Sequence, residues 1–153
     1  MPENLVDRHS RIRHDRGMGT TNYADTFIRV AEDCPAQEAQ EPPVGGTAPT
    51  IAALQHRLIA DHPYEFTSDD VLFTVHAIRR GIPDEARAGE REAFFARGQA
   101  CLRSSPLDKR YGWGIHHDAD GRIALVPLGS DEYRALAADP HVTQLTAMRS
   151  ARA

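Results

Sequence analysis

The stretch YGWGIHHDADGRIALV, residues 111–126, decides the fold of this chain. It holds two short runs of β-forming residues, 111–116 and 122–126, on either side of a His-Asp-Ala-Asp-Gly sequence. An Asp-Gly pair between two such runs is a strong hairpin signal, because glycine readily adopts the positive φ that tight hairpin turns require. The stretch therefore predicts two antiparallel strands joined by a turn at residues 117–121.

Further β-forming segments flank the hairpin at a distance along the chain. Residues 22–31 predict a first strand and residues 142–148 predict a last one, because both contain aromatic or β-branched side chains at close intervals. Between the hairpin and the last strand, Ser130 can accept a hydrogen bond from the first turn of a short helix that runs through Leu136. Pro140 would prevent that helix from continuing.

Three helices are predicted between the first strand and the hairpin. Apolar residues at helical spacing follow Thr50, which is placed to cap the first helix. Thr67 and Asp70 fit a capping box at the start of the second, and residues 84–97 predict a third, highly charged helix. The order β-α-α-α-β-β-α-β lacks the regular βαβ alternation of parallel sheets. We therefore predict an α+β fold, an antiparallel sheet of about four strands with roughly three to four helices on one face.

Composition and charge limit the classes of protein to which this chain can belong. The chain has 153 residues, of which 41% are hydrophobic and 26% are charged, and its net charge is −4. Residues 18–153 are predicted to form a single α+β domain, and residues 1–17 a disordered N-terminal extension, because the latter carry almost no apolar side chains. The acidic balance argues against nucleic-acid binding, and the lack of a run of about 18 apolar residues argues against a membrane span.

The densest group of chemically useful side chains lies between Cys101 and His117. Arginine offers a planar fork that matches carboxylate or phosphate, hydroxyl groups add donors, and an aromatic face can stack on a flat group. We therefore predict a cleft that binds an anionic small molecule. Its candidate contacts are Arg103, Ser104, Ser105, Lys109, Arg110, Trp113 and, near the C-terminus, Arg149.

Two other interpretations of the same segment stay open. Gly112 and Gly114 suit a twisted strand whose Trp113 packs in the core, and Arg103 can bond main-chain carbonyls or pair with an acid. Alternatively, the segment forms a protein-interaction module. That hypothesis predicts an exposed apolar patch around Trp113.

The two cysteines, Cys34 and Cys101, allow a thiol-dependent enzyme as an alternative function. Cys101 lies close to Arg103, a cation that favours the thiolate, and His116 is a candidate base if the fold brings it near. Both cysteines can equally be small buried hydrophobic residues. So few cysteines, together with an N-terminus that lacks a secretory pattern, predict reduced thiols and a cytoplasmic protein.

Metal binding is not predicted. His116 and His117 are adjacent, so on a strand they point to opposite faces and cannot readily bind one ion together. Residues 118–121 begin like a calcium-binding loop, but the glycine stands at the fourth position and not the sixth. The segment is therefore predicted to be a turn, and the sequence identifies no cofactor.

Six short motifs are shared with a known family: TNYADTFI (21–28), VAEDCP (30–35), TSDDVLF (67–73), CLRSSPL (101–107), KRYGWGIH (109–116) and AMRS (147–150). Through them the chain resembles a small bacterial family of uncharacterised proteins, defined only as a domain of unknown function. The resemblance implies a shared fold, a prokaryotic cytosolic origin and a start near Met18. It brings no activity, because none is assigned to the family.

Overall fold

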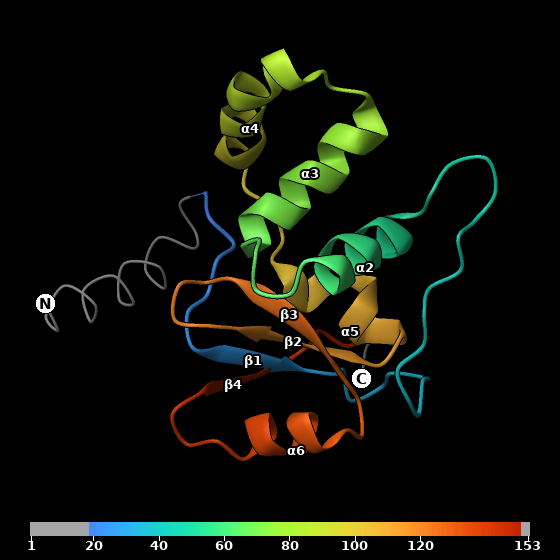
Figure 1. Ribbon diagram of the computed structural model, residues 1–153, viewed down its shortest axis with the longest axis vertical. Coiled ribbons are helices and arrows are strands. Elements are labelled where there is room, and N and C mark those ends of the chain that lie inside the picture. The colour runs from blue at the N-terminus through green and yellow to red at the C-terminus, as the bar shows by residue number, and fades with distance from the viewer. Residues whose placement is uncertain (1–18, 151–153) are drawn as a thin grey trace, which may run out of the picture.

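The computed structural model of the chain describes residues 19–150. They form a four-stranded sheet with helices packed on both of its faces (Figure 1). The predicted α+β class is therefore confirmed. The predicted disordered extension, residues 1–17, lies outside the described residues.

The four strands of the sheet stand in the order β3-β2-β1-β4. The predicted hairpin is confirmed, because β2 and β3 pair antiparallel around a turn in which the Gly121 amide donates to the Asp118 carbonyl. The strands are β1 (Thr26–Arg29), β2 (Trp113–His117), β3 (Ile123–Pro127) and β4 (Thr143–Thr146).

The pairing of β1 with β4 differs from the prediction. These two strands run parallel, with Phe27 opposite Gln144, so the sheet is mixed and not purely antiparallel. The physical reason is the connection after β3. It crosses the sheet through a helix, passes β2 and β1, and brings β4 to the far edge in the direction of β1, as crossovers between parallel strands do.

The predicted helix starts are confirmed by side-chain caps. The Thr50 and Ser130 hydroxyls each accept a backbone N–H, and Thr67 and Asp70 form a complete capping box. A short helix beginning at Pro106 was not predicted. The α-helices are α2 (Ile51–Asp61), α3 (Ser68–Arg80), α4 (Arg87–Ala96), α5 (Pro106–Arg110) and α6 (Asp131–Ala137), and the 3-10 helices are η2 (Asp84–Ala86) and η3 (Leu102–Ser104).

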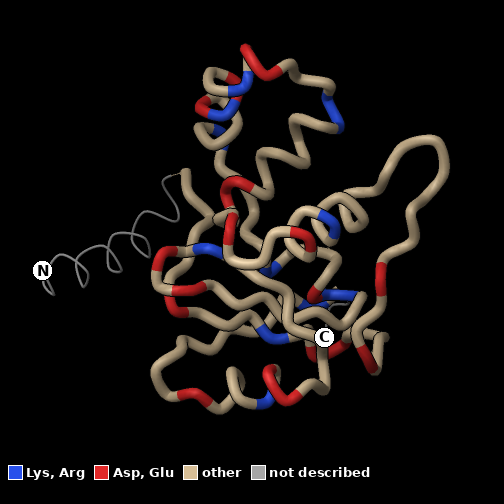
Figure 2. Tube along the Cα trace, viewed as in Figure 1, with Lys and Arg blue, Asp and Glu red and all other residues tan. Residues whose placement is uncertain are grey.

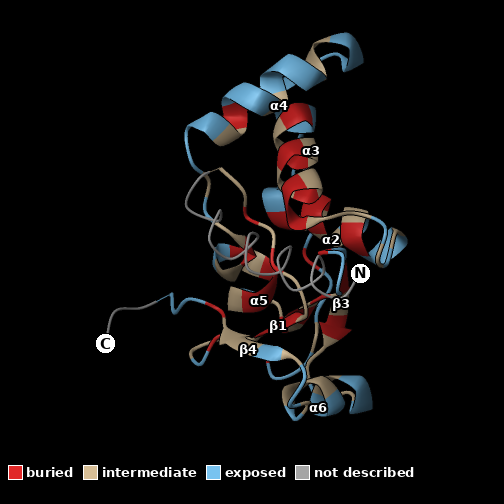
Figure 3. Cartoon of the chain, turned by 90° about the vertical axis from the view of Figure 1, so that its left-hand side faces the viewer, coloured by how far each residue is buried: buried red, intermediate tan, exposed pale blue. Residues whose placement is uncertain are grey.

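Side chains that alternate along β1 separate the two faces of the sheet. Ile28 packs in the main core on the face that α2, α3 and α5 cover, whereas the Phe27 ring meets the Tyr133 ring of α6, with centroids 4.9 Å apart. Figure 3, which shows the sheet from its side, places α6 below it and the other helices above. Helices α2, α3, α4 and α5 thus lie on one side of the sheet, as predicted, and α6 packs on the other, where Tyr133 meets Phe27.

Gly114 of β2 makes the close packing of α6 possible. A Cβ atom at this position would lie 2.7 Å from the Phe27 ring and 2.9 Å from the Tyr133 ring. Such distances are shorter than side chains tolerate. The glycine therefore lets the two aromatic rings meet directly against the strand.

A second, smaller core lies between α3 and α4, away from the sheet. It is formed by Phe73, Ala77 and Phe94. Phe94 is the buried residue of α4, and the rest of that helix is largely exposed in Figure 3. Helix α4 thus packs against α3 at the end of the molecule farthest from α6 (Figure 1). A hollow lies between these two helices.

Within residues 19–150, none of the helices combines the length and the apolar character that crossing a membrane requires.

Candidate functional site

The serines of the predicted cleft have different surroundings. The buried Ser105 hydroxyl caps α5 by accepting the Leu107 amide at 3.1 Å, and it donates to the Gln55 side-chain oxygen at 2.6 Å. Ser104 next to it is exposed. Ser105 therefore joins α5 to α2, and its hydrogen-bonding capacity is used within the fold.

The cations of the predicted cleft do not share one hollow. The Arg103 Nε atom donates to the Thr146 carbonyl at 2.8 Å, and Arg149 pairs with Glu32 at 3.6 Å on the exposed C-terminal segment. Lys109 is half-buried and Arg110 is exposed, both on α5. These side chains line neither of the hollows described below.

Trp113 is half-buried at the start of β2. Its indole N–H donates to the Gln40 carbonyl at 2.8 Å, and its ring centroid lies 5.2 Å from that of His56 on α2. The large hydrophobic side chains that are exposed among the described residues are Val44, Ile51, Ile78 and Met148. Trp113 is not one of them, but Val44 lines a hollow together with His56.

The candidate thiol and the candidate base lie on opposite faces of the sheet. Cys101 packs against the main core, and its Sγ atom is 3.2 Å from the Tyr23 hydroxyl. His116 pairs with Phe27 on the α6 face, where its Nδ1 atom is 2.8 Å from the Tyr64 hydroxyl. The arrangement expected of a Cys-His enzyme is therefore not formed by these two residues.

Cys34 and Cys101 are both free, half-buried thiols that pack against the main core. No group of three or more His, Cys, Asp or Glu side chains within residues 19–150 is arranged to hold a metal ion. The described part of the chain thus offers two free thiols and no preformed metal centre.

Two buried polar groups were not singled out by the sequence analysis. The Asp108 carboxyl group of α5 is fully buried, and neither oxygen has a hydrogen-bond partner among the described residues. Burial raises the pKa of Asp108 well above its usual value of 3.8, and the nearby Cys101 adds to the rise. Burial thus favours the neutral, protonated carboxyl group, which makes Asp108 unsuitable for binding a cation.

His117 is the second such group, on the opposite face of β2 from His116. Its imidazole is fully buried, and neither nitrogen makes a well-formed hydrogen bond, although the Ile115 and Thr26 backbone lies close. Burial lowers the pKa of His117 from 6.5 to about 4, so the ring is neutral in the folded protein near pH 7.

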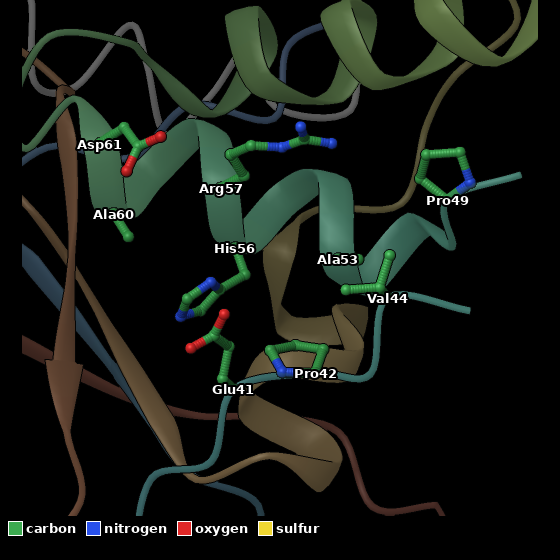
Figure 4. Close-up of a pocket in the computed structure, with 9 residues that line it drawn as sticks. All are labelled: Glu41, Pro42, Val44, Pro49, Ala53, His56, Arg57, Ala60 and Asp61. Carbon is green, nitrogen blue, oxygen red and sulfur yellow. The ribbon is translucent and has the colours of Figure 1, made fainter. Parts of the chain in front are cut away.

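A hollow beside α2 has a mixed charge. It has a volume of about 450 Å³ and lies between α2 and the loop of residues 41–49. Figure 4 shows the Glu41 carboxylate directed toward the His56 ring, while Arg57 extends along the other side of the helix. Asp61 adds a second carboxylate to the wall. Two acids against one arginine make this hollow unfavourable for an anion.

A hollow of about 380 Å³ between α3 and α4 has the opposite character. His76 and Arg80 face it from one side of α3, because residues four apart share a helix face, and Arg97 faces it from the end of α4. Glu90 is the acid on its wall. We call it the cationic hollow, with the lining His76, Arg80, Gly81, Ile82, Pro83, Ala86, Glu90 and Arg97.

Neither arginine of the cationic hollow is neutralised inside the fold. Arg80 and Arg97 make no ion pair or side-chain hydrogen bond among the described residues. The pKa of His76 is lowered from its usual 6.5, first by partial burial and then by the positive charges of Arg80 and Arg97, while Glu90 opposes them. The pKa of His76 therefore depends on the charges of both arginines.

The cationic hollow forms only where α3 and α4 pack together, so the sequence alone did not predict it. Figure 2 shows acidic and basic residues interspersed on α4, so no block of one charge marks the segment. The spacing of His76 and Arg80 was the available signal, but it has meaning only once α4 is known to bring Arg97 alongside.

These features define a small α+β fold with a mixed sheet, the buried and unpartnered Asp108 and His117 among its described residues, and a cationic hollow between outlying helices. Residues 18–153 match a family described as "Family of unknown function (DUF6157)", and the chain belongs to that family. The resemblance predicted from its motifs is confirmed to that extent. Neither a curated protein nor a solved structure matches the chain.

Proposed function

We propose that the protein binds a small anionic molecule in the cationic hollow, with Arg80 and Arg97 as its direct contacts. The observation that carries the proposal is the convergence of two arginines from separate helices on one hollow of about 380 Å³, with no acid of residues 19–150 paired to either. This keeps the predicted ligand class and moves it away from residues 101–113.

The chemistry of arginine supports an anion with two or more oxygen atoms. A guanidinium group presents parallel N–H donors that match a carboxylate or a phosphate, and an unpaired fork is free to do so. Arg80 alone has a simpler explanation, because basic residues in the last turn of a helix complement its dipole. Arg97 has the same explanation at the C-terminal end of α4. What favours a shared ligand is that the two helix ends place both arginines on one hollow.

The net charge of the lining also favours this hollow over its neighbour beside α2. Two arginines face one glutamate here, whereas one arginine faces two carboxylates there. The cations of the predicted cleft are less suitable, because Arg103 and Arg149 already have partners.

The experiment follows the imidazole pKa of His76 in the full chain by NMR, in sodium sulfate and in sodium chloride of equal ionic strength. Sulfate keeps its charge across the titration, and equal ionic strength removes the difference in screening. A bound anion offsets the arginine charges, so sulfate should raise the pKa of His76. Acetate should do so more weakly, because it carries one charge.

Matched variants assign the effect to the hollow. Arg80→Ala and Arg97→Ala should each raise the pKa of His76 in chloride and remove the response to sulfate. Arg122→Ala removes an exposed arginine far along the chain and should keep the full response. Equal titration curves in the two salts, together with an unchanged melting temperature, would refute anion binding at this site.

A further inference from the structure

A third hollow of about 230 Å³ lies beside the cationic hollow, where α2, α3 and α4 meet. Its apolar lining comes from all three helices: Ile51, Leu72, Val75 and Phe94. Its polar lining is Gln55, His76, Arg79, Arg80 and Gln99. We call it the apolar hollow. It is large enough for a short alkyl chain or a single aromatic ring and too small for a helix of another protein.

The two hollows share part of their walls. His76 and Arg80 line both of them, and no other residue does. The His76 ring lies against Phe94 of the apolar hollow, with centroids 4.5 Å apart and planes at 33°. A ligand held by Arg80 on one side of His76 therefore has an apolar surface within reach on the other.

Ile51 leaves apolar surface uncovered at this place. It is the first residue of α2 and is 41% exposed although it lines the apolar hollow. Arg79 on the same wall adds a third cation near the junction. Apolar surface next to unpaired cations complements a ligand that carries both an apolar group and a negative charge.

We infer that the ligand is an amphipathic small molecule, a carboxylate or phosphate that bears a short alkyl or aryl group. This inference rests on the proposed function, because the arginines hold the anionic group. The apolar group occupies the apolar hollow against Ile51, Leu72 and Phe94. The limited volume sets a length beyond which further carbon atoms remain in water and add nothing.

The test is an affinity series of straight-chain carboxylates measured by calorimetry at pH 7 and constant ionic strength, from acetate through butanoate and hexanoate to octanoate. Each methylene that enters the hollow should tighten binding by up to about fourfold, the value for full burial of a CH₂ group. The affinity should stop rising once the hollow is filled. Equal affinity for all chain lengths would overturn the inference and leave anion binding intact.

Variants of one exposed residue separate the two hollows. Ile51→Ala should reduce the gain per methylene, and Ile51→Glu should abolish hexanoate binding by placing a negative charge in the apolar hollow. Ile51→Ala should keep the sulfate response of His76, because it changes no charge beside His76 and Arg80. Glutamate is favourable in the first turn of a helix, so the second variant should retain its fold. Circular dichroism checks this before binding is measured.

Ile78→Ala is the matched control. Ile78 is 43% exposed on α3 and lines neither of the two hollows, so the series should be unchanged. If hexanoate binds equally well to the Arg80→Ala and Arg97→Ala double variant, binding is purely apolar and the inference is wrong. If no anion, sulfate included, binds to the wild-type protein, the proposed function itself fails.

Discussion

The rings of Tyr23 and His117 meet edge to face, with centroids 5.4 Å apart and planes at 87°. The Tyr23 hydroxyl lies 3.2 Å from the Cys101 Sγ atom. Tyr23 therefore connects the buried histidine of β2 to the segment that precedes η3. Tyr23 belongs to the main core and Cys101 packs against that core, which gives residue 101 a packing role.

His117 should make the protein sensitive to acid. The unfolded chain takes up a proton at this residue near pH 6.5, whereas the native state resists it until about pH 4. The unfolded state thus binds more protons in that window, and stability falls as the pH drops from 6.5 to 4, by up to about 3 kcal/mol. An NMR titration should find His117 neutral at pH 5. A midpoint near pH 6.5 would contradict the prediction.

Asp108→Asn should stabilise the protein at pH 7. The native pKa of Asp108 is raised, so the native state binds more protons than the unfolded chain above pH 3.8 and loses stability as the pH rises. An uncharged side chain of the same shape removes this penalty, with a gain on the order of 1–3 kcal/mol. Urea unfolding at pH 7 and at pH 3.5 measures the effect.

The pH dependence distinguishes this effect from a change in packing. The gain from Asp108→Asn should shrink at pH 3.5, where the wild-type carboxyl group is largely protonated in both states. Asp120→Asn, at the exposed hairpin turn, serves as the control and should change stability little at either pH. A gain that stays equal at both pH values would mean that ionisation of Asp108 is not its cause.

Gly114→Ala should destabilise the protein by about 1–3 kcal/mol, the usual cost of forcing an extra carbon atom into a packed core. The added Cβ would meet the Phe27 and Tyr133 rings and push α6 away from the sheet. Gly89→Ala is the opposite case, because that helical position has open space around it. It should stabilise α4 by about 0.5–1 kcal/mol. Thermal unfolding of the two variants should shift in opposite directions.

Ser105→Ala should cost about 2–3 kcal/mol. The change removes the cap of α5 and leaves the buried Gln55 oxygen without its donor. Ser104→Ala, at the exposed neighbouring position, should have little effect on denaturant midpoints. Because we assign Ser105 to the fold, its alanine variant should keep the His76 response to sulfate. Loss of that response in a folded variant would return residue 105 to the candidate binding residues.

Local signals in the sequence were enough for most elements of the fold. The Asp-Gly turn predicted the hairpin and the Thr67–Asp70 pair predicted the start of α3, because both depend on hydrogen bonds between residues close in the chain. The start of α5 carried a comparable signal, a serine followed by Pro106 at the first helical position and Asp108 two residues later. Because the charged residues around it were interpreted as contacts for an anion, this helix signal was not used.

The parallel pairing of β1 with β4 and the position of the cationic hollow could not be predicted in this way. Phe27 and Gln144 face each other because a crossover carries the chain beneath the sheet, and the intervening sequence does not encode which edge it reaches. Arg103 and Lys109, which are close together in the sequence, both act on the charge of the buried Asp108 and line neither hollow. Arg80 and Arg97 meet only because α4 packs back on α3.

The parallel register has a consequence for synthesis of the chain. Thr26 of β1 pairs with His117 on one side and with Thr143 on the other, and both partners are translated long after it. At ribosomal speeds, on the order of ten seconds pass between the appearance of β1 and that of β4. During this time an apolar strand presents two unpaired edges to the cytosol of the translating cell. We therefore expect the folding yield of the nascent chain to depend on chaperones more than its small size suggests.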